Sequence, residues 1–318
     1  MDSRRVGDSG LRVSSVGLGT MTWGRDTDAG DAADQLREFL DAGGSLLDTA
    51  ATYSDGAAEE VIGELLTDQV HRQDVVLCSK AGVRDGRVDA SRGALLDALD
   101  SSLARLGTDH LDLWLVQAPD PRTPLAETLW TMQHAVATGR TRYVGLANHP
   151  AWQLAHATTV LSGAGAPGLA AAQMEYSLLE RGIEREVLPA AASLGVGVLA
   201  WSALGRGVLT GKYRRAVPAD SRAASPHLRG FVEPYLTDRA RSVVEAVATA
   251  ADGLGRAPVE VALAWTRDAP GVASAIIGAR SPAQLRGALA ADDLELPEQI
   301  RTVLDEVTQP ELGYPERR

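Results

Sequence analysis

Three side chains suited to acid–base chemistry follow two short runs of the chain. The run 45–47 leads into Asp48, with Tyr53 five residues later, and the apolar run 75–79 ends in Lys80. A tyrosine has an ordinary pKa of about 10, which a neighbouring ammonium group lowers because it favours the phenolate. Lys80 would supply that ammonium group and Asp48 would orient it. The trio would make Tyr53 a general acid, although strand ends also carry such residues as ordinary hydrogen-bonding groups.

Gln117 stands at the end of a third apolar run, residues 111–116. In a barrel of parallel strands, side chains at the carboxyl ends of the strands converge on one face, where the chemistry is done. We therefore expect Asp48, Tyr53, Lys80 and Gln117 to share one site.

The elements that would position these side chains alternate along the chain. Strand-like runs occur at 13–20, 45–50, 75–80, 111–117, 143–148, 171–177, 197–202 and 273–279. Helical spacing of apolar residues occurs at 30–42, 58–67, 91–105, 124–138, 150–161, 184–194, 238–251, 258–267 and 282–290. Alternation of this kind predicts an α/β fold with a parallel sheet, and eight repeats favour a closed (β/α)8 TIM barrel over a doubly wound sheet.

Three segments lie outside this eightfold plan. Residues 4–13 predict an N-terminal β-hairpin that plugs the bottom of the barrel, and residues 203–237 predict a long loop after strand seven. An extra C-terminal helix is expected at 297–307, followed by a polar tail. Because no low-complexity linker divides the chain, residues 1–318 are interpreted as a single domain.

Composition excludes several classes of protein. Hydrophobic residues make up 45% of the chain and charged residues 23%, as in ordinary soluble proteins, and no run approaches the roughly twenty apolar residues of a membrane helix. The net charge of −11 argues against general binding to nucleic acid or anionic membranes. Cys78 is the only cysteine, so we expect a buried, inert thiol and neither an intramolecular disulfide framework nor a metal cluster of cysteines. No other metal site is expected. The first residues do not resemble a signal peptide, which predicts a cytoplasmic protein.

Six separated motifs extend from residue 48 to residue 285. They are Asp48-Thr-Ala-x-x-Tyr53, the strand ending in Lys80, Gly145-Leu-Ala-Asn148, Gln173-Met-Glu-Tyr176, Trp201-Ser-Ala-Leu-Gly-Arg-Gly-Val-Leu-Thr-Gly-Lys212 and Gly278-Ala-Arg280-Ser-x-x-Gln284-Leu285. In this order they resemble the aldo-keto reductases, in the bacterial branch related to potassium-channel β-subunits and aryl-alcohol or sugar-type reductases. The resemblance implies NADPH-dependent reduction of an aldehyde or ketone to an alcohol, with Tyr53 as proton donor.

The resemblance also implies which residues bind NADPH. Asn148 and Gln173 would pair with the nicotinamide carboxamide, and Trp201 would stack on the nicotinamide ring. The glycine-rich loop would follow the pyrophosphate, because glycines permit close backbone approach and exposed N–H groups bind anions. Arg280 or Ser281 would contact a 2′-phosphate, which favours NADPH over NADH. The full set is Gly19, Thr20, Met21, Asp48, Asn148, Gln173, Trp201, Ser202, Leu204, Gly207, Leu209, Gly211, Lys212, Gly278, Arg280 and Gln284.

The chain departs from the family pattern at three positions. Gln117 stands where reductases of this family usually have a histidine, and Ala147 and Ala288 stand where serine and asparagine are common. A glutamine amide still donates a hydrogen bond to a carbonyl oxygen, but it does not titrate. Two functions therefore remain open: a working, slower reductase, and a weakly active NADPH-binding protein that senses redox state or regulates a partner.

The substrate pocket is the least specified part of the sequence. Trp23, Tyr53 and Gln117 are the candidate substrate residues, and aromatic residues of 218–237, Phe231 and Tyr235, would complete a wall around a small carbonyl compound. His149 follows Asn148 and is a weaker candidate to overlook the site. The remaining histidines are interpreted as surface residues.

Overall fold

The barrel strands form a closed ring. The structure is a computed structural model that describes residues 1–166, 168–219, 221–310 and 313. Within these residues, parallel strands pair in the cyclic order β3-β4-β5-β8-β9-β10-β11-β12. Their bounds are β3 (Val16–Gly19), β4 (Leu46–Asp48), β5 (Val76–Ala81), β8 (Leu111–Val116), β9 (Thr141–Ala147), β10 (Ala171–Glu175), β11 (Gly197–Trp201) and β12 (Val272–Ile277). The predicted (β/α)8 TIM barrel is confirmed.

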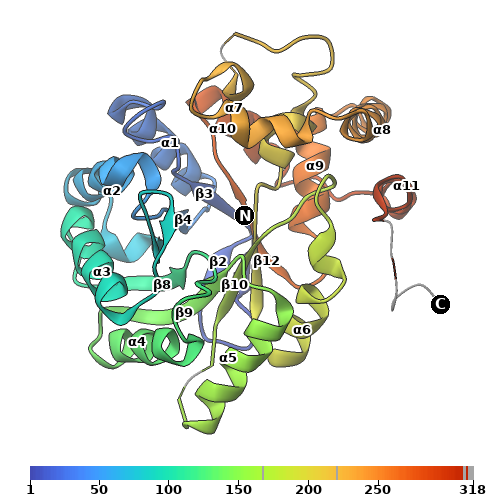
Figure 1. The fold of residues 1–318 in the computed structure, drawn as a ribbon. Helices are drawn as coiled ribbons and strands as arrows, with labels where there is room; N and C mark the ends of the chain where they lie inside the picture. Colours follow the sequence, from blue (N-terminus) through green and yellow to red (C-terminus); the bar gives the residue numbers. More distant parts are fainter. Residues whose placement is uncertain (167, 220, 311–312, 314–318) are drawn as a thin grey trace.

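Helices surround the ring, as Figure 1 shows. Their bounds are α1 (Ala29–Asp41), α2 (Ala57–Asp68), α3 (Arg92–Leu106), α4 (Leu125–Ala137), α5 (Ala151–Gly163), α6 (Val187–Leu194), α8 (Asp238–Leu254), α9 (Pro258–Arg267), α10 (Pro282–Leu289) and α11 (Glu298–Thr308). Pro258 and Pro282 occupy the first residues of their helices, where a missing N–H costs little because it has no partner within the helix.

Both faces of the barrel wall are buried, which explains the nearly continuous apolar sequences of its strands. On β8, Leu113 and Leu115 belong to a cluster built from strand residues and lie inside the barrel. Trp114 and Val116 alternate with them and pack in the cluster that contains the helices. Cys78 is fully buried in the inner cluster, as the sequence predicts.

The N-terminal hairpin closes one end of the barrel. Strand β1 (Ser3–Arg5) pairs antiparallel with β2 (Arg12–Ser14), and Val6, Leu11 and Val13 join the inner cluster. The first predicted strand, 13–20, is therefore divided, because Val13 pairs in the hairpin and the barrel strand begins at Val16.

The long loop after β11 carries short helices. They are the 3₁₀ helices Gly205–Thr210, Arg222–Ala224 and Glu233–Tyr235, and helix α7 (Arg229–Val232). A further small sheet, β6 (Val83–Arg84) with β7 (Arg87–Val88), follows β5 and was not expected from the sequence. No helix among the described residues is long and apolar enough to cross a membrane.

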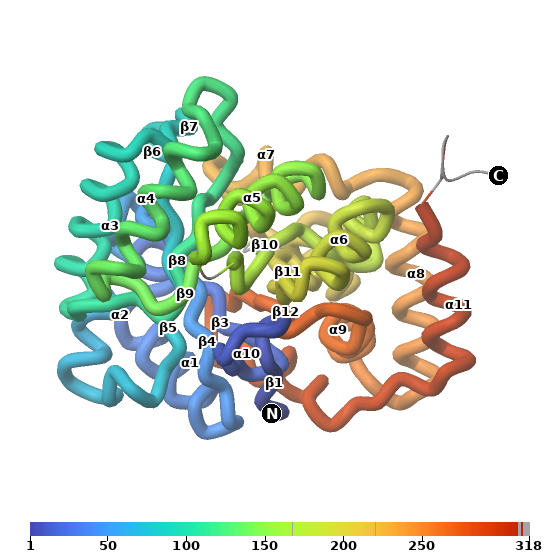
Figure 2. The backbone as a smooth tube through the Cα atoms, turned by 90° about the horizontal axis from the view of Figure 1, so that it is seen from below, coloured from blue at the N-terminus to red at the C-terminus, as the bar shows by residue number. Residues whose placement is uncertain are grey.

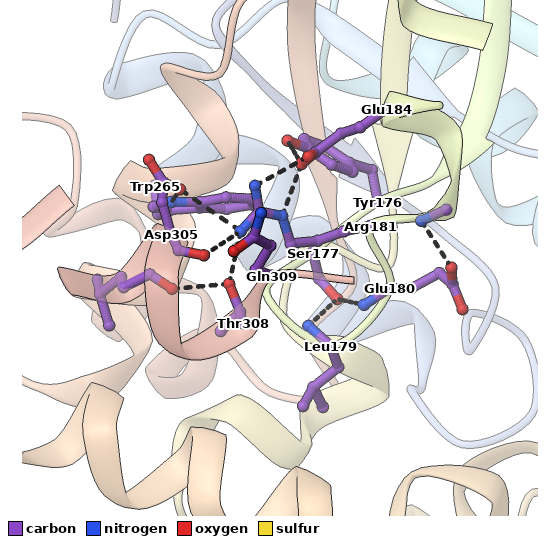
Figure 3. Close-up of polar contacts among 12 residues, drawn as sticks. Tyr176, Ser177, Leu179, Glu180, Arg181, Glu184, Trp265, Asp305, Thr308 and Gln309 are labelled. Atoms are coloured by element: carbon purple, nitrogen blue, oxygen red, sulfur yellow. Dashed lines mark hydrogen bonds and ion pairs between the residues drawn. The ribbon is translucent and has the colours of Figure 1, made fainter. Parts of the chain in front are cut away.

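Helix α11 packs beside α8 on the flank of the barrel (Figure 2). Arg181, in the loop after β10, holds it there: its guanidinium donates to the Asp305 carbonyl oxygen and to Thr308 Oγ1, both at 2.8 Å (Figure 3). Trp265 of α9 donates from Nε1 to Asp305 Oδ1 at 2.8 Å. The expected C-terminal helix is thus present, while most of the tail after it, 311–312 and 314–318, lies outside the described residues.

Candidate active site

The ends of β4 and β5 bring a carboxylate and an ammonium group together. Lys80 Nζ donates to both carboxylate oxygens of Asp48 at 2.8 Å and to the Thr49 carbonyl oxygen at 2.8 Å. Tyr53 begins the 3₁₀ helix Tyr53–Gly56, and its hydroxyl lies 3.4 Å from Lys80 Nζ. The neighbouring strands thus place the three predicted side chains in one hydrogen-bonded group.

Burial decides the protonation of this group. Loss of water around the phenol raises the pKa of Tyr53 above its ordinary value, and the attraction to Lys80 offsets this only in part. Burial alone would lower the pKa of Lys80, but the carboxylate of Asp48 raises it. The predicted lowering of the Tyr53 pKa is therefore wrong. The main reason is the burial of the phenol, which makes the phenolate costly, and the negative charge of Asp48 acts in the same direction, so Tyr53 keeps its proton at neutral pH.

Gln173 is a further member of this group. It lies on β10, is almost fully buried, and donates from Nε2 to Asp48 Oδ1 at 2.7 Å. Thr20, also buried, donates to the Asp48 carbonyl oxygen at 3.2 Å. Both side chains hold Asp48 in place, a role that sequence reasoning did not assign to them.

A second chain of hydrogen bonds crosses from β8 to β11. The Gln117 side chain lies 3.4 Å from Thr52 Oγ1, next to Tyr53, and its backbone oxygen accepts from Asn148 Nδ2 at 2.9 Å. Asn148 has a positive φ of 60°, and its Oδ1 accepts from Trp201 Nε1 at 3.0 Å. The amide groups expected to meet a carboxamide are therefore engaged with neighbouring strand ends.

A cavity of about 320 Å³ opens beside Asp48 and Tyr53 and continues along the loop after β11. Predicted residues that line it are Gly19, Met21, Asp48, Tyr53, Trp201, Ser202, Leu204, Gly207, Lys212, Gly278, Arg280 and Gln284. Predicted residues that do not line it are Thr20, Trp23, Lys80, Gln117, Asn148, Gln173, Leu209 and Gly211.

Two of these residues pack into the core instead. Trp23 is fully buried in the cluster of the outer barrel wall and its Nε1 donates to Gln35 Oε1 at 3.3 Å. Leu209 is also fully buried, in the cluster with α8 and α9. Trp23 therefore does not form the expected wall of the substrate pocket, because the turn after β3 directs its ring toward α1.

The middle of the cavity is lined by an unusual stretch of backbone. In the segment Gly205–Thr210, both Arg206 and Gly207 have positive φ, at 57° and 91°. A Cβ atom added at Gly207 would lie 3.1 Å from Lys212 Nζ. The absence of a side chain at Gly207 leaves room for an anionic group beside that ammonium.

The far end of the cavity is cationic and includes an arginine that sequence reasoning missed. Arg222 Nη2 donates to the Gly278 carbonyl oxygen at 3.2 Å, whereas its Nε is buried and has no hydrogen-bond partner among the described residues. Burial, and next the positive charge of Arg280, lower the pKa of Arg222. Arg222 and Arg280 both line this cavity, and two guanidinium groups that face one space are suited to bind a phosphate.

Arg206, in the long loop after β11, lines the cavity and joins this loop to β10. Its guanidinium forms two hydrogen bonds with the Glu175 carboxylate, at 2.8 and 2.7 Å, and donates to the Phe231 carbonyl oxygen at 2.6 Å. The ring of Phe231 stacks on Trp201 with centroids 6.4 Å apart, and both rings line the cavity. Tyr235, the other expected wall residue, lies with its ring 4.9 Å from the Arg206 guanidinium.

Comparison with known proteins agrees with this geometry. The model of the Aldo/keto reductase family matches residues 15–309. The "Uncharacterized oxidoreductase YrpG" of Bacillus subtilis (strain 168) is 35% identical over 320 residues, which cover 96% of each chain. The "Aldo-keto reductase YhdN" of the same organism is 31% identical over 294 residues, covering 90% of this chain and 87% of that protein. The "Probable voltage-gated potassium channel subunit beta" of Arabidopsis thaliana is 32% identical over 324 residues, covering 100% and 98%. The chain therefore belongs to the aldo/keto reductase family of oxidoreductases.

Proposed function

We propose that this protein reduces an aldehyde or ketone to an alcohol with NADPH as the cofactor and Tyr53 as the proton donor. The observation that carries the proposal is the buried Asp48–Lys80 pair with the Tyr53 hydroxyl 3.4 Å from the ammonium nitrogen. Asp48 and Tyr53 line the main cavity, and Lys80 lies directly behind them. A neutral phenol beside a fixed ammonium is a suitable acid for an oxygen that gains negative charge.

The cavity fits a dinucleotide phosphate in the chemistry of its lining. Trp201 would hold the nicotinamide ring, the backbone around Gly207 and the ammonium of Lys212 would hold the pyrophosphate, and Arg222 with Arg280 would hold the 2′-phosphate. The Nε of Arg222, for which the described part of the chain provides no acceptor, supports a phosphate at this end, because a buried donor without an acceptor is costly. We therefore favour NADPH over NADH.

The residues would divide the reaction among them. NADPH supplies the hydride when bound. Tyr53 would donate its hydroxyl proton to the carbonyl oxygen, and Lys80 would stabilise the phenolate that remains. Asp48, held by Gln173, would keep Lys80 charged and in place. Gln117 would orient the carbonyl oxygen through its amide N–H, once that group turns from Thr52.

Gln117 also supports a second candidate function, a weakly active protein that binds NADPH to sense redox state or regulate a partner. Its amide lies at the long distance of 3.4 Å from Thr52 and is a weaker acid than an imidazolium group. The relative named as a potassium channel subunit shows that the family includes proteins named for a partner. The cytoplasmic location stays a prediction.

Replacement of Tyr53 tests the proposal. Stopped-flow oxidation of NADPH would be followed with a panel of aldehydes, ketones and quinones. Tyr53→Phe is expected to lower kcat by roughly 10²- to 10⁴-fold, the usual contribution of a general acid, with an unchanged Kd for NADPH. Tyr143→Phe, at the opposite end of the barrel, is the matched control.

Two results would contradict the proposal. Full turnover by Tyr53→Phe would show that another group donates the proton. Tight NADPH binding by the wild type, without reduction of any carbonyl compound, would make the sensing function the leading one.

A further inference from the structure

A second cavity, of about 220 Å³, lies between the barrel wall and helices α4 and α5. Val116, the last residue of β8, and His149, two residues after β9, line its inner side, and Leu125 of α4 and Trp152 of α5 line its outer side. Val116 points to the helix layer, away from the barrel interior. No described residue lines both this cavity and the main one, so the second cavity is a separate space.

His149 presents an unused acceptor to this space. The side chain is 3% exposed, and its Nδ1 lies 2.7 Å from the Ala147 carbonyl oxygen. A carbonyl oxygen only accepts, so Nδ1 carries the proton and donates. Burial lowers the pKa of His149, which keeps the ring neutral. The lone pair of Nε2 therefore remains available, and no described residue donates to it.

The other polar groups of the cavity also include an acceptor without a donor. Gln153 Oε1 is buried and has no hydrogen-bond partner among the described residues. The hydroxyls present are already used, since Thr128 Oγ1 donates to the Ala90 carbonyl oxygen at 3.0 Å and Thr123 Oγ1 donates to Asp120 Oδ2 at 2.8 Å. The cavity therefore has acceptors to fill, and an occupant must bring donors.

The rest of the lining is apolar. Val116 and Leu125 cover part of the wall, and Trp152, 65% exposed, stands at the rim with a large ring surface open to solvent. A tryptophan ring of this kind packs well against the apolar face of a small ring or chain. The volume is below the roughly 300 Å³ at which pockets for drug-sized molecules begin.

We propose that this cavity is a second ligand subsite, which binds a small alcohol or diol through hydroxyl donors to His149 Nε2 and Gln153 Oε1 and through apolar contact with Trp152. A carbonyl or ether of the same shape has no donor, and would leave both acceptors unpaired. The inference does not depend on the reaction proposed for the main cavity.

Titration followed by nuclear magnetic resonance tests this subsite. The full chain, with ¹⁵N-labelled histidine, would be titrated with cyclohexanol and with its donor-free counterpart, cyclohexyl methyl ether. The His149 signals are assigned by their loss in the His149→Asn variant. We expect a saturable shift of Nε2 with cyclohexanol and roughly tenfold weaker binding of the ether, which pairs with neither acceptor.

Two variants test the lining of the cavity and a third is the control. All three replace exposed or half-buried residues, so they leave the core intact. Trp152→Ala and Gln153→Leu are each expected to weaken cyclohexanol binding several-fold. Trp130→Ala removes another exposed tryptophan, on α4, that does not line the cavity, and should change nothing. No saturable shift of His149 would mean that the cavity takes only water and would overturn the proposal. Equal affinity for the ether, or binding unaffected by both variants, would overturn it as well.

Discussion

Tyr53 shows how one residue depends on its neighbours in space. An isolated Lys80 would promote loss of the phenol proton, but Lys80 is held at 2.8 Å by Asp48, and burial makes the phenolate costly. The pair therefore does not create a phenolate at rest. Its proposed role begins when the proton leaves, because the fixed ammonium then faces a new negative charge.

Removal of Lys80 should affect both the stability of the protein and the proposed proton donation by Tyr53. Lys80→Met leaves the carboxylate of Asp48 buried without its cation, so the free energy of unfolding should fall by about 3–5 kcal/mol in urea denaturation, and kcat should fall with it. The double variant Asp48→Asn with Lys80→Met should lose less stability, since no unpaired charge remains. Equal losses would show that the charge pairing is not the cause.

The same pair predicts the response to pH. The pKa of Lys80 is raised in the folded protein, so its contribution to stability is fully present below the ordinary lysine value of about 10.4 and is lost as pH rises through the folded value. Urea denaturation between neutral and alkaline pH should show a loss of stability only above about pH 10, and Lys80→Met should lack this part of the loss.

Gln117 is the residue that separates the two candidate functions. Gln117→His introduces an imidazole donor next to the Thr52–Tyr53 segment. Removal of such a donor lowers the rate roughly a hundredfold, and exchange of a weaker donor for a stronger one should change it less. We therefore expect kcat to rise by up to about tenfold. Steady-state kinetics on the best carbonyl substrate would measure it. A loss of kcat would show that glutamine is adapted to a particular substrate.

At the scale of elements, α11 is joined to the loop after β10 by one arginine, in addition to its packing beside α8. Arg181, whose side chain is 11% exposed, also pairs with Glu184 at 2.7 Å, and its guanidinium lies 5.2 Å from the Trp265 ring (Figure 3). Tyr176 donates to the same carboxylate at 2.7 Å. The loop after β10 and the C-terminal helix thus form one polar cluster.

Replacement of Arg181 should release this helix. Arg181→Met breaks the half-buried pair and leaves Glu184 without its cation, so we expect the free energy of unfolding to fall by about 3 kcal/mol and hydrogen exchange to rise in 298–308. Arg241→Met is the matched control, because Arg241 forms an exposed pair with Asp238 that is worth little. Unchanged exchange in α11 would show that apolar packing on α8 holds the helix by itself.

At the scale of the whole molecule, the two ends of the barrel differ in structure. The hairpin closes one end, and the candidate active site lies at the carboxyl ends of the strands, as in other barrels of this kind. We propose that residues 1–318 act as one domain, since the hairpin and α11 each pack on the barrel or its helices.

A glycine at the closed end tests this division. Gly7 has a φ of 56°, and a Cβ atom there would lie 2.2 Å from the Gly195 carbonyl oxygen. Gly7→Ala should lower the free energy of unfolding by several kcal/mol while the Kd for NADPH stays unchanged. Gly107→Ala has a similar φ of 60° and open space around it, so it should cost only the roughly 1 kcal/mol of the backbone conformation. Similar losses in both variants would show that the hairpin contact is not tight.

The sequence by itself determined the strands, the helices and the residues at the strand ends. These features depend on local periodicity: buried strands read as apolar runs, helices repeat their apolar residues every three to four positions, and prolines mark helix starts. The family motifs predicted the candidate site residues between Asp48 and Gln284. The substrate, the cofactor preference and the site roles stay predictions.

Only the tertiary structure decided which side chains meet and what their surroundings do to them. Arg222 reaches the cationic end of the cavity from the middle of a long loop, Gln173 binds Asp48 across the barrel, and Trp23 turns into the core. The direction of the Tyr53 pKa shift depends on burial and on the Asp48–Lys80 distance. Contacts between residues far apart in the chain, and the loss of water around them, are not contained in local sequence patterns.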